Sequence, residues 1–137
     1  LRYAVRINGL TAIALTKLDV LSQFERIKVC VGYSYQGKVY HEFPPHQTVF
    51  HKCEPEYLEM PGWNTEISEI TDKERLPEEA RRYIEFIQQA AGVPVEIVSV
   101  GPRRTQTVWM RKELRPPVVE EPPFLNLEQF DPPDPGA

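Results

Sequence analysis

The sequence predicts an α/β fold, on three observations taken along its 137 residues. Residues Leu76 to Ala91 carry apolar side chains at helical spacing, which indicates one long amphipathic helix. Short apolar runs stand before and after that helix, at Ala12 to Leu15 and at Val95 to Val98, and their length is typical of buried strands. Between them, β-branched and aromatic residues flank Gln36-Gly37, a pattern that predicts a β-hairpin.

In the first half of the chain, Leu1 to Asn8 is interpreted as the end of a helix that Gly9 stops. The predicted hairpin consists of Arg26 to Tyr35 and Lys38 to Glu42. Tyr57 to Met60 is expected to return as another short strand before a Pro-Gly turn.

The long helix has start and stop residues of its own in the sequence. Pro77 suits the first turn, Glu78 and Glu79 complement the positive end of the helix dipole, and Gly92 follows as a stop. A final strand is predicted from Thr105 to Trp109. The helix face expected to pack into the core consists of Ala80, Ile84, Ile87 and Ala91, with Tyr83 alongside.

Charge and proline content divide the chain into two parts. From Glu113 onward there are six acidic residues and one basic residue, a net charge of −5, which leaves +1 for residues 1–112 out of the total of −4. Seven of the 14 prolines lie between Pro116 and Pro135, so residues 113–137 are expected to be an acidic, proline-rich tail after one domain of residues 1–112. The nearly neutral domain lacks the clustered basic face that duplex nucleic acid requires.

The composition also bears on the compartment. No apolar run approaches the roughly 20 residues needed to span a bilayer, and no signal-peptide pattern opens the chain. Two cysteines, Cys30 and Cys53, indicate a reduced compartment rather than a disulfide framework, and the apolar neighbours of Cys30 predict a buried thiol. We therefore expect a soluble, cytoplasmic protein that binds neither membrane nor nucleic acid.

The candidate binding site consists of two loops that lie far apart in the sequence, each directly after an apolar run. The first loop is Leu15-Thr16-Lys17-Leu18-Asp19. A carboxylate at Asp19 can accept hydrogen bonds from both N1–H and the exocyclic amine of guanine, while the stem of Lys17 can lie along the face of the base. The pattern indicates guanine recognition, and a surface ion pair between Lys17 and Asp19 is the alternative.

The second loop is Ser99-Val100-Gly101-Pro102, which follows the second apolar run. The hydroxyl of Ser99 and the backbone N–H of Gly101 are donors that suit the O6 acceptor of guanine. Adenine would mismatch these groups and the carboxylate of Asp19. Taken without the first loop, the same four residues are also compatible with an ordinary glycine-proline turn.

These loops belong to a wider set of motifs that resembles one known family. The motifs are Leu1 to Leu10, Leu15 to Leu21, Met60 to Trp63, Leu76-Pro77, Gly92 to Val95 and Ser99 to Pro102. In this order they resemble the C-terminal portion of adenylosuccinate synthetase, the GTP-dependent ligase that joins IMP to L-aspartate. The resemblance covers roughly residues 1–108. It implies that the chain is a fragment of that enzyme, with the C-terminal part of a P-loop-NTPase-like mixed sheet, a flanking helix and a hairpin.

The resemblance also implies roles for the loop residues. Lys17 would cover the guanine of GTP, Leu18 would line the pocket and Asp19 would read N1–H and the amine. Ser99 and Gly101 would close over O6, and Val100 would complete the guanine site. The Mg²⁺ ion, IMP, aspartate and the catalytic residues belong to the missing portion of the enzyme, so we expect this segment alone to be inactive and the full enzyme to be a homodimer.

Other residues invite functional interpretations that the sequence does not favour. Zinc ligands are one, with the candidates His41, His46, His51 and Cys53, but their spacing is not that of a zinc finger and surface histidines are the simpler explanation. Trp63 could stack on a base, yet a tryptophan beside a Pro-Gly turn is more typical of a side chain that pins the turn to the core. Arg103 and Arg104 could reach phosphates, or simply begin a solvated strand.

The alternative to an enzyme portion is a non-catalytic binding or structural fragment, which needs the missing N-terminal part or a partner. A binding domain should fold alone, whereas a piece of a larger sheet should expose apolar side chains.

Overall fold

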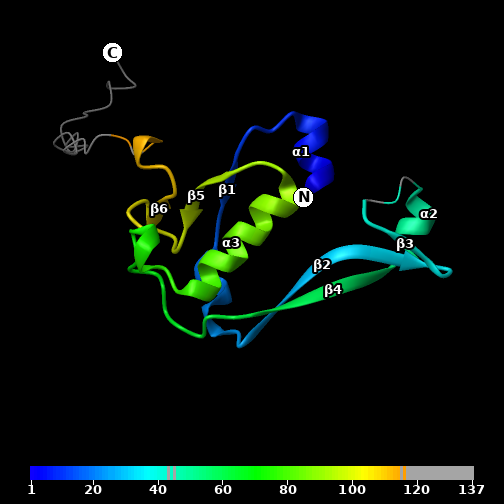
Figure 1. Ribbon diagram of the computed structural model, residues 1–137, viewed down its shortest axis with the longest axis horizontal. Coiled ribbons are helices and arrows are strands. Elements are labelled where there is room, and N and C mark those ends of the chain that lie inside the picture. The colour runs from blue at the N-terminus through cyan, green and yellow to red at the C-terminus, as the bar shows by residue number, and fades with distance from the viewer. Residues whose placement is uncertain (43, 45, 115, 117–137) are drawn as a thin grey trace, which may run out of the picture.

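Two three-stranded sheets and one long helix make up the fold in the computed structural model, which describes residues 1–42, 44, 46–114 and 116. The helices are α1 (Arg2–Asn8), η1 (Leu18–Gln23), α2 (Gln47–Phe50), η2 (Lys73–Arg75), α3 (Glu78–Ala91) and η3 (Lys112–Leu114). The strands are β1 (Ile13–Leu15), β2 (Arg26–Tyr35), β3 (Lys38–Tyr40), β4 (Glu54–Pro61), β5 (Val95–Ser99) and β6 (Thr107–Trp109). Figure 1 shows α3 running alongside both sheets.

The first sheet is mixed and has the order β1-β5-β6. β1 pairs with β5 in parallel, with Ile13 opposite Val95 and Leu15 opposite Val98, and β6 pairs with β5 antiparallel. Since the two parallel strands run in the same direction, their carboxyl ends, Leu15 and Ser99, lie at the same edge of the sheet. The long connection between them carries the second sheet and α3.

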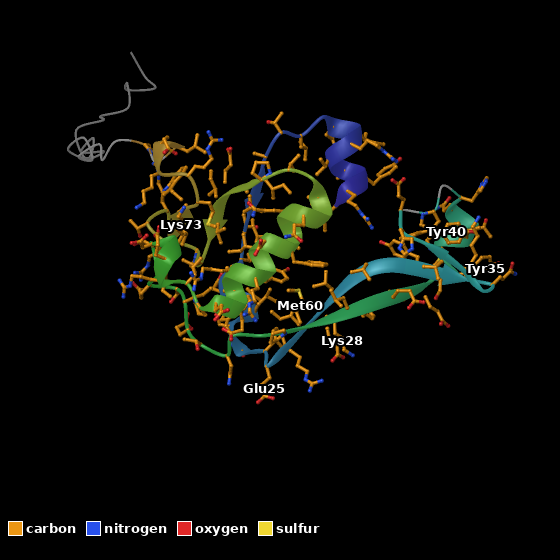
Figure 2. All side chains as sticks on the ribbon, viewed as in Figure 1. Glu25, Lys28, Tyr35, Tyr40, Met60 and Lys73 are labelled. Atoms are coloured by element: carbon orange, nitrogen blue, oxygen red, sulfur yellow. The ribbon has the colours of Figure 1, made fainter. Side chains whose placement is uncertain are left out.

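The second sheet has the order β3-β2-β4 and is antiparallel throughout. The predicted hairpin is confirmed, and its two turn residues, Gln36 and Gly37, have φ of +50° and +76°, as a tight hairpin turn requires. In Figure 2, Met60 of β4 lies on the side that faces α3, whereas Lys28 of β2 points away from it. This alternation is why Ile27, opposite Met60, is buried.

The long helix α3 joins the two sheets through one core. Its buried residues are the four expected from the helical spacing, Ala80, Ile84, Ile87 and Ala91. The first three of these belong with Ile27 of β2, Val98 of β5 and Val108 of β6 to a single cluster of buried residues. The helix begins at Glu78, two residues after the predicted start, and Gly92 ends it with φ of +74°.

Several sequence-based expectations need correction. Cys30 is exposed rather than buried, because strand alternation places it on the outer face of β2 together with Lys28. The hairpin return ends at Tyr40 instead of Glu42, and β4 extends well beyond the predicted Tyr57 to Met60. The last strand begins at Thr107, because Gln106 closes the preceding loop.

Other expectations stay predictions. The mixed α/β architecture is confirmed, but its P-loop-NTPase-like character and the division at residue 112 are not tested by the fold. Most of the expected proline-rich tail, residues 115 and 117–137, lies outside the described part of the chain. Among the residues that are described, no helix has the length and apolar character required to cross a membrane.

Gly62 provides a test of how the second sheet joins the rest of the fold. Its N–H donates to the Glu25 carbonyl at 2.8 Å, and a Cβ added at Gly62 would lie 1.9 Å from the Phe24 carbonyl oxygen. We expect Gly62→Ala to lower the free energy of unfolding of the 137-residue chain by about 3 kcal/mol, measured by urea denaturation.

The matched control is Gly9→Ala, where φ is +59° but a new Cβ would meet nothing within 4 Å. In that variant the free energy of unfolding should fall by only about 1 kcal/mol, the cost of placing alanine in the left-handed region. Equal losses at the two positions would contradict the close approach at Gly62.

Candidate functional site

The two candidate loops meet at one edge of the mixed sheet. The first loop leaves the carboxyl end of β1 and continues into η1, and the second leaves the carboxyl end of β5 beside it. Leu18, at the start of η1, is 1% exposed and packs in the same cluster as Val98 and Val100, which are fully buried. The two loops are therefore neighbours, and that they form one binding site stays a prediction.

The first loop presents its two charged side chains on either side of a buried leucine. Lys17 has φ of +61° and an exposed side chain, and Asp19 is partly buried in the first turn of η1. In the described part of the chain, neither side chain has a hydrogen-bond or ion-pair partner, so the alternative of a Lys17–Asp19 ion pair is wrong. Both groups are free to meet a ligand.

Leu18 and Val100 anchor the two loops to the core. Both were expected among the guanine-site residues, but they are 1% and 0% exposed. They hold the two loops to the core through apolar burial, and these exposures include the main chain, so almost no surface of either residue faces solvent.

The two donors that the sequence analysis proposed for O6 differ in the structure, because one is already hydrogen-bonded within the loop and the other is not. The hydroxyl of Ser99 donates to the carbonyl of Gly101 at 2.9 Å, so its hydrogen is used inside the loop. The N–H of Val100 donates to the Gln106 carbonyl at 3.0 Å. Among the described residues the N–H of Gly101 has no hydrogen-bond partner, although the residue is buried, so it is the donor of this loop that still lacks an acceptor.

Trp63 pins the first loop to the core, as the sequence favoured. Its side chain is 5% exposed, which excludes the stacking alternative, and its indole N–H donates to the hydroxyl of Ser22 in η1 at 3.2 Å. The ring lies 6.1 Å from that of Tyr83 on α3, and burial raises the pKa of Tyr83 above its ordinary value. Trp63 therefore connects η1, which carries Asp19, to the long helix.

Gln106 is the residue of this region that the sequence analysis missed. It is 8% exposed, and its side chain accepts from the backbone N–H of Arg103 at 3.0 Å. A Cβ at Gly101 would come within 2.4 Å of the Gln106 side chain, so only glycine fits there. No local pattern marks Gln106, because a glutamine before a strand is ordinarily exposed.

The arginines, the possible zinc ligands and the apolar cavity do not add to the candidate site. The side chains of Arg103 and Arg104 are exposed, as expected of a solvated strand start. The described residues contain no group of three or more His, Cys, Asp or Glu side chains that could hold a metal ion. A mostly apolar cavity of about 480 Å³ lies between α1, β2 and α3, and none of the loop residues lines it.

Comparisons with known proteins give consistent results. A sequence model of the family described as adenylosuccinate synthetase matches residues 1–108. The chain is 55% identical over 111 residues to the adenylosuccinate synthetase of Geotalea daltonii, a match that covers 81% of this chain and 26% of that protein. The enzyme of Geobacter sulfurreducens is 54% identical over 107 residues, 78% of this chain and 25% of that protein.

A solved structure is similar as well. The fully ligated adenylosuccinate synthetase of Plasmodium falciparum matches with a TM-score of 0.74 at 33% identity, over 80% of this chain and 27% of that chain. The chain thus spans about a quarter of the length of the relatives it matches.

The Trp63–Ser22 hydrogen bond generates a stability prediction. Trp63→Phe removes the indole N–H and leaves a buried hydroxyl at Ser22, which is 6% exposed. We expect a loss of about 2 kcal/mol in unfolding free energy, from the lost hydrogen bond and the smaller ring together.

The control is a double-mutant cycle with Ser22→Ala. If the bond is formed, the second substitution should cost less in the Trp63→Phe background than in the original chain. Additive losses in urea denaturation would show that the two side chains do not interact.

Proposed function

The chain belongs to the adenylosuccinate synthetase family, and we propose that it is the guanine-recognising portion of a GTP-dependent ligase that converts IMP and L-aspartate to adenylosuccinate. The observation that supports this proposal is that the loop with Lys17 and Asp19 and the loop with Gly101 both leave the carboxyl edge of the β1–β5 pair, with Leu18 and Val100 in one buried cluster. The family match over residues 1–108 supports it.

The proposed recognition uses complementary hydrogen bonds. The carboxylate of Asp19 accepts from N1–H and the 2-amino group of guanine, and the unpaired N–H of Gly101 donates to O6. The exposed stem of Lys17 covers one face of the base. Adenine presents an acceptor at N1 and an amine at position 6, so it would place like groups against both loops.

The proposed role of this segment is to position GTP for phosphoryl transfer, a reaction that depends on positioning and charge stabilisation. In the synthetase, GTP phosphorylates O6 of IMP, and the amine of aspartate then displaces that phosphate. Mg²⁺ supplies charge stabilisation at the phosphates, but the described residues offer no ligand cluster for it. We therefore assign Mg²⁺, IMP and aspartate to the remainder of a cytoplasmic, homodimeric synthetase.

Exposed apolar side chains favour this assignment over an independent binding module. Leu1, Ile7, Phe24 and Tyr57 are each at least half exposed. Burial of such side chains against further protein is favourable, and a chain that covers a quarter of its relatives leaves room for that protein.

Substitution of Asp19 by asparagine tests the guanine assignment in a complete synthetase that carries this segment. The amide would turn one acceptor into a donor that faces the 2-amino group of guanine, while the 2-oxo group of xanthine could accept from it. We expect kcat/KM to fall by about a hundredfold or more for GTP and to rise for XTP, because buried polar mismatches discriminate strongly.

The control is Glu25→Gln, a carboxylate-to-amide change at an exposed residue outside both loops (Figure 2). It should leave both nucleotides unaffected, and the KM values for IMP and aspartate should stay constant in both variants. An unchanged preference for GTP in folded Asp19→Asn protein would show that the guanine pocket lies elsewhere.

A further inference from the structure

Three backbone and side-chain hydrogen bonds close the second loop, and all three involve Gln106. Its carbonyl accepts from the N–H of Val100 at 3.0 Å, and its own N–H donates to the Arg103 carbonyl at 2.9 Å. Its side-chain Oε1 accepts from the N–H of Arg103 at 3.0 Å. These bonds join Gln106, at the end of the loop, to Val100 at its start and to Arg103 in its middle.

The side chain of Gln106 also lies directly against Gly101. An added Cβ at Gly101 would come within 2.4 Å of both Cδ and Oε1 of Gln106. Gln106 is 8% exposed and Val100 beneath it is fully buried, so the loop has no room to shift toward the core. The position of the Gly101 N–H is thus set by the Gln106 amide.

A second residue fixes which way that amide faces. The Nε2 group of Gln106 donates to Oε1 of Glu69 at 3.5 Å. A carboxylate only accepts hydrogen bonds, so Glu69 favours the orientation in which Nε2 faces it and Oε1 faces the N–H of Arg103. The reversed amide would leave Arg103 facing a donor.

We propose that Gln106 is a positioning residue for guanine specificity, which holds the N–H of Gly101 in place to donate to O6, with Glu69 setting the orientation of the Gln106 amide. The proposal rests on the proposed function, since it assumes that Gly101 meets O6. Gln106 itself touches no substrate. A donor displaced or tilted away from its acceptor forms a weaker hydrogen bond, so the contacts of Gln106 affect base selection.

The test measures selectivity for the groups at position 6 and at position 2 of the base separately, in a complete synthetase that carries this segment. In 6-thio-GTP the N1–H and 2-amino groups remain, but sulfur is a larger and weaker acceptor at position 6. In ITP the 6-oxo group remains and the 2-amino group is absent. The GTP to 6-thio-GTP ratio of kcat/KM reports on Gly101, and the GTP to ITP ratio reports on Asp19.

Gln106→Met keeps the length of the side chain and removes both polar atoms. We expect the KM for GTP to rise about tenfold with kcat little changed, the size of one hydrogen bond. The GTP to 6-thio-GTP ratio should fall toward one, while the GTP to ITP ratio and the KM values for IMP and aspartate stay constant. Gln89→Met, at an exposed glutamine of α3, is the matched control and should change nothing.

Exchanging the amide and the carboxylate between Gln106 and Glu69 tests the same assignment with side chains of the same size. Gln106→Glu keeps an acceptor for Arg103 but places a carboxylate against Glu69, so selectivity at position 6 should drop. The double variant Gln106→Glu/Glu69→Gln restores a donor–acceptor pair and should recover that selectivity, as a purely steric role of Gln106 would not predict.

The outcomes separate the two proposals. Unchanged 6-thio-GTP selectivity in Gln106→Met, equal losses for every substrate, or no recovery in the double variant would overturn the role of Gln106. If Asp19→Asn leaves the GTP to ITP ratio unchanged, the guanine assignment itself fails, whatever the Gln106 variants do.

Discussion

The site depends on one constraint, the parallel pairing of β1 with β5. Leu15 and Ser99 are far apart in the sequence, and only this pairing brings their strand ends to one edge. The pairing closes a long connection, which costs chain entropy. Burial of Leu18, Val95 and Val98, each at most 2% exposed, offsets that cost, so the apolar residues that stabilise the pairing also bring the loops together.

Buried side chains then give each loop a single arrangement. The first loop is held by Leu18 from within and by Trp63 through Ser22, and the second by Val100 and Gln106. The described part of the chain leaves no buried side-chain nitrogen or oxygen without a hydrogen-bond partner. A polar network of this kind is rigid because any displacement would strand a buried donor or acceptor. Rigid loops suit base recognition, where donors and acceptors must already face the ligand.

Base recognition at this edge would be remote from the chemical step. A base is bound far from the phosphorus that reacts, so its contacts contribute binding and positioning to the reaction. Under the proposed function, the described residues need no metal-ligand cluster, because the metal acts at the phosphates and not at the base.

Local patterns in the sequence were sufficient for α3 and for the hairpin at Gln36-Gly37, because each depends on neighbours within a few residues. The exposure of Cys30 was missed, because an apolar run does not reveal which face of a strand each residue takes. Only the tertiary structure decided that the Ser99 hydroxyl is used within its loop, that Leu18 and Val100 face the core, and that Gln106 clasps Gly101. Those features depend on contacts between distant segments, and such contacts exist only once β1, β5 and β6 have paired.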